Sequence, residues 1–219
     1  MDAAEPLPGP APAAPEPAPV TAGARPISWI QTFTGRRVDL DPFPGPGYGS
    51  KDPIVIEDIA HHLALLNRFT GGTRWPFSVA QHSVNVAKHA GCWDGRNYLR
   101  PDGGRFGLLH DAAEAYYGDV SSPLKGLLSP RYHDLEQAAL VAILVRFDLI
   151  DLTAEVERAV KHSDLIMLAT EKRDLLNLSG HAWGLTVEPD RRLTGHPLSW
   201  RTAEEDYLTH FRLLFGEDR

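Results

Sequence analysis

Three polar residues lie where the local pattern predicts the buried side of a helix. His82 follows Val79 by three residues and precedes Val86 by four, so all three share one face. His110 and Asp111 directly follow an apolar run, and because neighbouring helical residues differ by about 100°, both side chains can reach an ion beside the helix. A buried ionisable group needs a partner, a metal or a changed protonation state. A lone histidine on such a face is more often a satisfied core residue, so the interpretation depends on the whole set.

Two carboxylates extend this set. Glu114 follows His110 by four residues and Asp111 by three, which places it beside both on a helix. Asp164 falls on the face marked by Val160, where leucine would be expected. Two imidazoles with two carboxylates suit a divalent transition metal with open positions for water and substrate, whereas an all-sulfur or all-oxygen set would indicate structural zinc or calcium. The sequence therefore favours a catalytic metal site.

The order of these residues resembles that of a known family. His82, then His110-Asp111, then Asp164 is similar to the H…HD…D signature of the HD-domain metal-dependent phosphohydrolases. The strings that extend the resemblance are Ser78–Ser83, Leu109–Glu114, Gly118-Asp119 and Pro123–Lys125. Together they look like the branch that contains bacterial 5′-deoxyribonucleotidases and phage dATP triphosphohydrolases, over roughly Ile30 to Leu176.

The resemblance implies a fold, a cofactor and a role for each residue. The metal ligands would be His82, His110, Asp111 and Asp164, and the residues of the hydrolytic step would be Glu114 and Asp119. The fold would be an all-α HD-domain helical bundle, and the cofactor one divalent ion such as Mn, Co, Zn or Fe. Metal coordination acidifies a bound water, whose proton a nearby Glu114 can take. Glu114 could instead orient His110, and Asp119, which follows Gly118, could be only a turn residue.

Cationic and aromatic residues near the first ligand are candidates for substrate binding. A nucleotide phosphate needs cationic clamps, and Arg68, Arg74 and Lys125 are close enough in sequence to supply them. Arg68 and Lys125 also match the family pattern, although each could be a solvated surface charge. Trp75 and Phe69 could stack on a base or could fill the core. The stretch that follows Arg68 departs from the nucleotidase branch, so base specificity is not transferred.

The leading functional hypothesis is the removal of phosphate from a deoxynucleoside 5′-phosphate by metal-activated water. A triphosphohydrolase of the dATPase type is an alternative within the same class, and a non-catalytic nucleotide- or metal-sensing module is an alternative from another. The stretch after His110-Asp111 offers no further histidine for a second metal and lacks the adjacent Glu-Asp pair of alarmone hydrolases. We therefore expect one metal and a nucleotide substrate.

The remaining histidines and one charged run have weaker claims. His61 and His62 lack a matching carboxylate pattern, and His89, two turns beyond His82, could line the mouth of the site. Surface or structural roles are expected for His133, His162, His181, His196 and His210. The run Glu171–Asp174 is mixed in sign and is typical of a solvated helix face.

Composition restricts the class of protein. The 219 residues are 42% hydrophobic and 23% charged, and the formal charge of −7 disfavours binding to a nucleic-acid polymer. The single cysteine, Cys92, cannot form an internal disulfide, which fits a reducing, cytoplasmic compartment. No run approaches the roughly 18 apolar residues of a membrane span. Apolar residues at 140–147 and in the terminal helix would permit a homodimer.

The pattern along the chain predicts one helical domain after a tail. Eight of the 18 prolines lie before residue 27, so residues 1–27 are expected to be a disordered Pro/Ala-rich tail and 28–219 the phosphohydrolase domain. Alternation around Gly35 suggests a small N-terminal β-hairpin. Helices are predicted from 56 to 68, from a Ser78 cap to 91, from 105 to 117, around 135–143, from a Thr153 cap to 178 as one helix or a broken pair, and from a Thr202–Glu205 capping box to 216.

Overall fold

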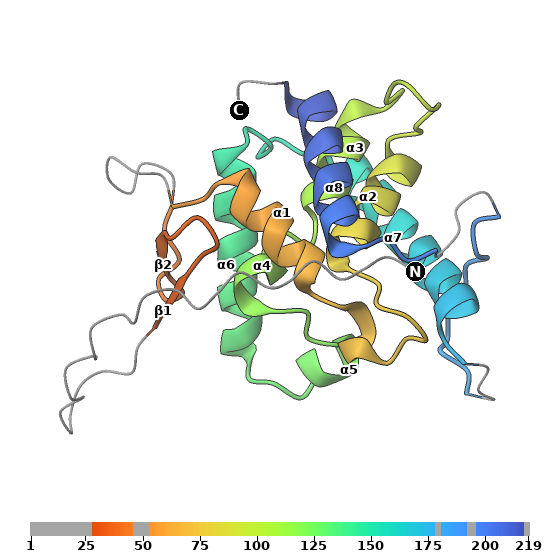
Figure 1. Cartoon of the computed structure of the whole chain (residues 1–219), viewed down its shortest axis with the longest axis horizontal. Coiled ribbons are helices and arrows are strands. Elements are labelled where there is room, and N and C mark those ends of the chain that lie inside the picture. Colours follow the sequence, from red (N-terminus) through yellow and green to blue (C-terminus); the bar gives the residue numbers. More distant parts are fainter. Residues whose placement is uncertain (1–27, 46–52, 178–180, 192–195, 217–219) are drawn as a thin grey trace, which may run out of the picture.

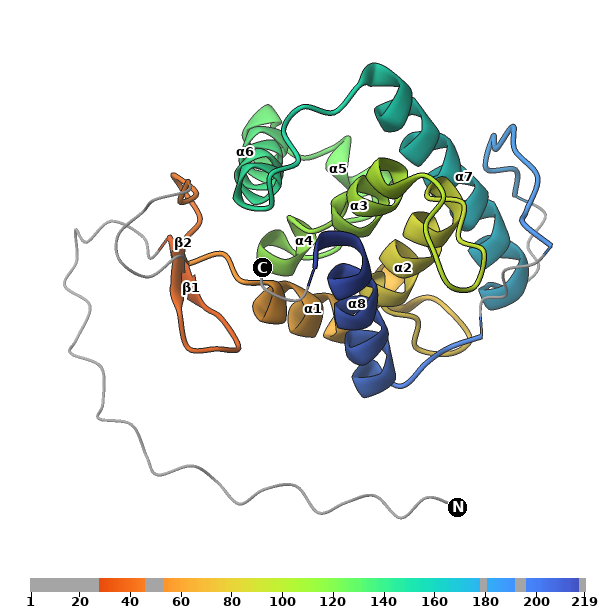
Figure 2. The ribbon, with the colours of Figure 1, turned by 90° about the horizontal axis from the view of Figure 1, so that it is seen from above.

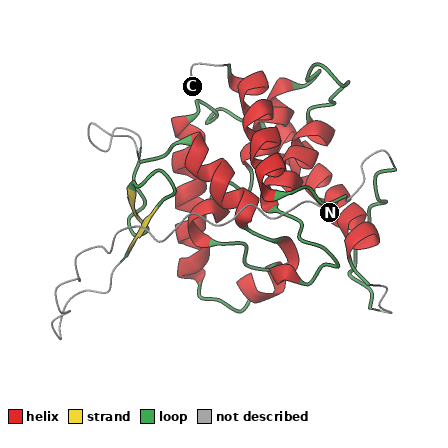
Figure 3. Cartoon of the chain, in the orientation of Figure 1, coloured by secondary structure: helices red, strands yellow, loops and turns green. Residues whose placement is uncertain are grey.

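The computed structural model describes residues 28–45, 53–177, 181–191 and 196–216. The predicted tail, residues 1–27, lies outside these ranges. The chain is mostly helical, with one small antiparallel hairpin at the edge of the bundle (Figures 1 and 3). Its elements in order are β1 (Trp29–Gln31), β2 (Arg37–Asp39), α1 (Ile56–Leu65), the short 3₁₀ segment η1 (Arg68–Gly71), α2 (Val79–Ala90), α3 (Pro101–Leu109), α4 (Glu114–Tyr117), α5 (Ser122–Lys125), α6 (Pro130–Arg146), α7 (Ala154–Leu175) and α8 (Trp200–Phe215). The predominantly helical fold and the hairpin are thus confirmed.

Helices α2 and α3 form the centre of the bundle. Both contact α7 on one side and α8 on the other, and α1 packs against α8 and α2 (Figure 2). The fully buried side chains between them include Val79, Leu108, Leu109, Tyr207 and Phe211. Within the part of the chain that the structure describes, no helix combines the length and the apolar character needed to cross a bilayer.

Glycine in α3 allows a close approach to α2. A Cβ atom at Gly107 would lie 2.9 Å from the Cα atom of Ala87, closer than packed carbon atoms can come. The carbonyl of Gly107 also accepts a hydrogen bond from the His110 ring at 2.8 Å. The absence of a side chain at this position therefore brings the end of α3, with His110, close to α2.

The helix predicted from 105 to 117 is interrupted. Helix α3 ends at Leu109, and a tight turn over residues 110–113 precedes α4. The turn is held by backbone bonds between residues three apart, from Ala112 to Leu109 and from Glu114 to Asp111. The apolar run continues through the turn because Ala112 and Ala113 are buried, which hides the interruption from the sequence pattern.

Other boundaries differ in smaller ways. Ser78 and Thr153 are N-caps as predicted, and the residues after Thr153 form one helix, α7, rather than a broken pair. Helix α1 ends at Leu65, three residues before the predicted end, because Leu66 is extended. The cap of α8 is Ser199, whose hydroxyl accepts a hydrogen bond from the amide of Thr202, so the predicted capping box was placed three residues too late.

Candidate metal centre

Three side chains from two neighbouring elements meet inside the bundle. His82 comes from the middle of α2, and His110 and Asp111 come from the turn that follows α3. One ligand atom from each can be chosen so that all three lie within 4.8 Å of one another. Asp111 Oδ2 is 3.6 Å from His82 Nε2 and 3.3 Å from His110 Nε2. This group could hold a metal ion.

Hydrogen bonds orient both imidazoles toward the same point. His82 Nδ1 lies 2.6 Å from Glu171 Oε1, and His110 Nδ1 lies 2.8 Å from the carbonyl oxygen of Gly107. Because a carbonyl oxygen can only accept, His110 Nδ1 carries a proton, and Nε2 is the nitrogen that can offer a lone pair to a metal. Both Nε2 atoms are buried and lack a hydrogen-bond partner among the described residues. Such atoms are costly to leave unsatisfied, and a cation between them would meet both.

Asp164 of α7 faces the same nitrogen of His82 as Asp111 does. Its Oδ1 is 3.4 Å from His82 Nε2, and its Oδ2 accepts a hydrogen bond from Lys161 at 2.9 Å. Burial raises the pKa of this carboxyl, but His82 and the charge of His110 outweigh burial and hold the pKa well below its usual range. The structure thus brings together all four predicted ligands, with Asp164 outside the tightest group.

The cluster attracts positive charge. Burial and the Arg68 charge lower the pKa of His82, yet Glu171 and Asp164 outweigh them and raise that pKa to about 9. The pKa of Asp111 is lowered: burial acts to raise it, and the neighbouring His110, His82 and Arg68 lower it by more. In the absence of a metal, the proton on His82 supplies the charge that the carboxylates require. A divalent cation would take the place of that proton.

Glu171 is a member of the centre that the sequence pattern missed. The prediction that Glu171 lies on a solvated helix face is wrong, because this residue is only 1% exposed. Its Oε1 contacts His82 Nδ1, and its Oε2 accepts a hydrogen bond from Arg68 Nε at 2.8 Å. The available signal was spacing: Glu171 follows Asp164 by seven residues, which is two helical turns and hence the same face.

Arg68 lies against this cluster in the structure. Its Nη1 is 3.6 Å from Asp111 Oδ2, and its side chain is 12% exposed. The pKa of its guanidinium is raised: burial opposes the shift, but the charges of Glu171, Asp111 and Asp164 outweigh it. A buried guanidinium held by two carboxylates is a rigid donor, as the predicted phosphate clamp requires.

Glu114, Lys125 and Asp119 form a second charged group beside the ligands. The Glu114 amide donates to the carbonyl of Asp111, and Glu114 Oε1 lies 3.4 Å from Lys125 Nζ. Lys125 also binds Glu136 at 2.7 Å. Burial, reinforced by the charges of Asp111 and Asp119, raises the pKa of Glu114 to about 9. Burial likewise raises the pKa of Asp119.

Arg74 and Trp75 lie away from the ligands. Arg74 donates to the carbonyl of Asp174 through Nη2 and to that of Leu175 through its amide. Its guanidinium covers the ring of Trp75, which is 49% exposed. Asp174 follows the proposed ligand Asp164 by ten residues, or about 15 Å along α7, and follows Glu171 by three. The contacts of Arg74 are with Asp174, Leu175 and Trp75, so the structure does not bring these two predicted substrate-binding residues against the proposed ligands.

Other histidines make structural contacts. His62 accepts from the amide of Phe33 and contacts the carbonyl of Ala115, which ties the hairpin to α4. His89 contacts Ser163 at 2.9 Å and lines a separate cavity of about 460 Å³. The buried His210 pairs with Tyr98, in agreement with its expected structural role.

Comparison with known proteins places the chain among bacterial relatives. No family model matches it. It is 38% identical over 158 residues to the uncharacterized protein YfdR of Escherichia coli K12, a match that covers 72% of this chain and 78% of YfdR. It is 33% identical over 159 residues to the uncharacterized protein RCAP_rcc00048 of Rhodobacter capsulatus, covering 69% of this chain and 75% of that one. The chain therefore belongs to the protein family that includes YfdR and RCAP_rcc00048.

Proposed function

We propose that this protein is a metal-dependent phosphohydrolase that removes phosphate from deoxynucleoside 5′-phosphates. One observation carries the proposal: the buried Nε2 atoms of His82 and His110, which lack partners among the described residues, lie beside the carboxylates of Asp111 and Asp164. A purely structural cluster would pair these nitrogens with hydrogen-bond partners. Two buried imidazole nitrogens that face carboxylates instead fit a cation that retains open positions.

The ligand chemistry favours a transition metal. Two imidazole nitrogens with two carboxylate oxygens suit Mn²⁺, Co²⁺, Zn²⁺ or Fe²⁺, whereas Mg²⁺ and Ca²⁺ prefer oxygen alone. Such an ion acidifies a bound water and polarises a phosphoryl oxygen. The resemblance to HD-domain phosphohydrolases supports the same set of ligands, and the helical fold agrees with it.

Two cations beside the ligands can meet an anionic substrate. Arg68 uses Nε to hold Glu171 and directs Nη1 toward Asp111, while a guanidinium has five N–H donors in all. Its remaining donors are available to phosphate oxygens in the bidentate geometry that guanidinium favours. Lys125, 30% exposed and 3.4 Å from Glu114, supplies a second positive charge.

Glu114 has the environment of a proton acceptor. Its Oε2 is buried and lacks a partner among the described residues, so once Glu114 is ionised this oxygen can receive a proton from an attacking water. Burial raises its pKa, while the charges of Lys125 and Arg68 lower it. Additional positive charge at the centre would lower the pKa further, toward the range in which a base is effective at neutral pH.

The test is an assay with product identification. The purified protein is stripped of metal, reloaded separately with Mn²⁺, Co²⁺, Zn²⁺ and Fe²⁺, and mixed with deoxynucleoside mono- and triphosphates. We expect metal-dependent release of inorganic phosphate from monophosphates. Release of intact triphosphate would instead identify a triphosphohydrolase. Tight metal binding without hydrolysis of any nucleotide would refute an enzymatic role and favour a sensing module.

A further inference from the structure

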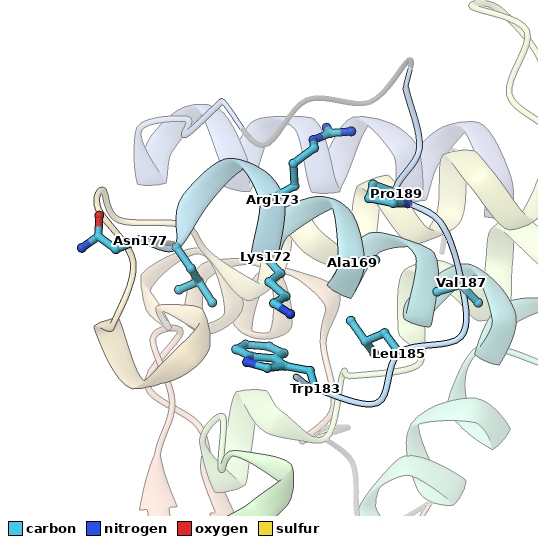
Figure 4. A pocket seen from close by; sticks show the side chains of 9 residues that line it. Ala169, Lys172, Arg173, Asn177, Trp183, Leu185, Val187 and Pro189 are labelled. Atoms are coloured by element: carbon cyan, nitrogen blue, oxygen red, sulfur yellow. The ribbon is translucent and has the colours of Figure 1, made fainter. Parts of the chain in front are cut away.

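A cavity lies between α7 and the segment that runs from 183 to 189 (Figure 4). Its volume is about 350 Å³, within the usual range of about 300–1,000 Å³ for small-ligand sites. Trp183, Leu185 and Val187 provide an apolar wall, and Lys172 extends from α7 toward the Trp183 ring (Figure 4). The cavity therefore combines one flat aromatic surface with a cation.

The cavity adjoins the metal centre through two pairs of consecutive residues. Arg68 and Glu171 form the ion pair that supports His82. The next residues, Phe69 and Lys172, each contact Trp183: the Phe69 and Trp183 ring centroids are 6.1 Å apart, and Lys172 Nζ lies 5.0 Å from the indole centroid. Arg68 Cζ lies 5.4 Å from the centroid of the Phe69 ring, which lies 6.1 Å from that of Trp183, so Phe69 links the proposed phosphate clamp to the Trp183 end of the cavity.

Phe69 lies in a turn whose backbone conformation is energetically unfavourable. Phe69 and Thr70 both adopt left-handed backbone angles, with φ of 57° and 53°. Each such residue other than glycine costs about 1–2 kcal/mol. Strained residues of this kind cluster at ligand sites, where the conformation places a particular side chain. Here the strained turn places an aromatic ring between Arg68, whose Cζ lies 5.4 Å from the Phe69 centroid, and Trp183.

Lys172, the cation beside the Trp183 ring, has no carboxylate partner in the described ranges. The contact of Lys172 there is with the face of Trp183, an attraction worth little in water. An aromatic ring that carries electronegative atoms could stack on the indole and accept a hydrogen bond from the ammonium group. Nucleobases have this chemistry, and in a nucleotide the base is joined to the phosphate through one sugar.

We propose that Phe69, Trp183 and Lys172 form the subsite for the base of a nucleotide whose phosphate is held at Arg68. This inference rests on the proposed function and specifies its substrate class: the protein distinguishes a nucleotide from a base-free sugar phosphate. It also assigns base contact to Trp183, far from Arg68 in sequence, rather than to the nearby Trp75.

The test compares two matched tryptophans. Trp183 and Trp29 are 41% and 37% exposed, and each has a cation 5.0 Å from its ring centroid, so Trp29→Ala controls for loss of an exposed, cation-covered indole. The metal-loaded variants are assayed with deoxynucleoside 5′-monophosphates and with 2-deoxyribose 5-phosphate. We expect Trp183→Ala to reduce the ratio of the two kcat/KM values about 10-fold or more, as loss of one base–aromatic stack implies. Trp29→Ala should leave the ratio within 2-fold.

A binding measurement separates failure of this inference from failure of the proposed function. Each of the four deoxynucleosides, which carry no phosphate to hydrolyse, is titrated while tryptophan fluorescence is followed in the unmodified protein, Trp183→Phe and Trp29→Phe. The subsite is supported, even if no nucleotide is turned over, when at least one deoxynucleoside quenches the fluorescence and this quenching is lost in Trp183→Phe but kept in Trp29→Phe. If none quenches, or if Trp183→Ala leaves the kcat/KM ratio intact in an active enzyme, the subsite is wrong.

Discussion

Replacing Glu171 with Gln tests the logic of the metal centre most directly. Glu171 accepts from two donors with two separate oxygens, Oε1 facing His82 Nδ1 at 2.6 Å and Oε2 facing Arg68 Nε at 2.8 Å. A glutamine of the same shape has one oxygen and one NH₂ group. Whichever way the amide is turned, an NH₂ group must therefore face His82 or Arg68.

The consequence for metal binding follows from the histidine tautomer. If the amide NH₂ faces His82, Nδ1 must become an acceptor, and the ring proton moves to Nε2, where it blocks the ligand lone pair. If the NH₂ faces Arg68, the guanidinium loses its anchor and two donors oppose each other in a buried site. Loss of a partner that orients a metal-bound histidine typically weakens metal affinity about 10- to 100-fold, or about 1.4–2.7 kcal/mol.

The assay is competition for Zn²⁺ or Mn²⁺ against a chelating dye, with thermal unfolding of the metal-free variant as a check on folding. Asp174→Asn is the matched control, because Asp174 lies three residues farther along α7 and pairs with the exposed Arg173 instead. We expect Glu171→Gln to lose at least 10-fold in metal affinity and Asp174→Asn to lose less than 2-fold. A folded Glu171→Gln variant with the affinity of the unmodified protein would refute the assigned role.

Four further predictions concern the proposed ligand Asp164, the proposed general base Glu114 and the packing of α3 on α2. Asp164→Asn should lose metal on dialysis, and full occupancy by elemental analysis would contradict its role as a ligand. Glu114→Gln should keep its metal but lose at least about 100-fold in hydrolysis rate. In metal-free protein the pKa of Glu114 is raised from 4.5 to about 9, so the stability that its protonation contributes is complete below pH 4.5 and declines as pH rises toward 9. Denaturant titrations at several pH values should therefore show that the free energy of unfolding declines less with pH in Glu114→Gln than in the unmodified protein. Parallel plots of unfolding free energy against pH for the two proteins would refute the shift. Gly107→Ala, whose new Cβ would lie 2.9 Å from Ala87, should lower the free energy of unfolding by about 1–3 kcal/mol, and an unchanged denaturation midpoint would contradict the close packing.

Local periodicity was sufficient to predict that His82 and Asp164 face the interior, because each stands on the inner face of its own helix. His82 shares the face of Val79 and Val86, and Asp164 shares that of Val160. Polar residues at such positions are detectable one helix at a time. The same rule also predicted the caps at Ser78 and Thr153, where the hydroxyl and the apolar stripe lie within one turn.

What the pattern missed depends on contacts between distant segments. Glu171 is 89 residues from His82 and 103 from Arg68, so its burial follows from how α7 packs on α2 and η1. When only the neighbouring residues Lys172 and Arg173 are considered, Glu171 has the sequence context of a solvated helix face. The turn at residues 110–113 was missed for a related reason, since the buried alanines within it preserve the apolar pattern of a continuous helix.

Under the proposed function, the charges of the centre explain why an anionic substrate would need a bound cation. The carboxylates of Asp111, Asp164 and Glu171 all have lowered pKa values, and two cationic groups, Arg68 and protonated His82, oppose them. A phosphate that approached this arrangement would be repelled by the three carboxylates, which weakens its attraction to Arg68. A divalent cation that displaces the His82 proton adds one net positive charge and offsets part of that repulsion. The same ion that acidifies water would therefore also make the pocket electrostatically able to accept a phosphate.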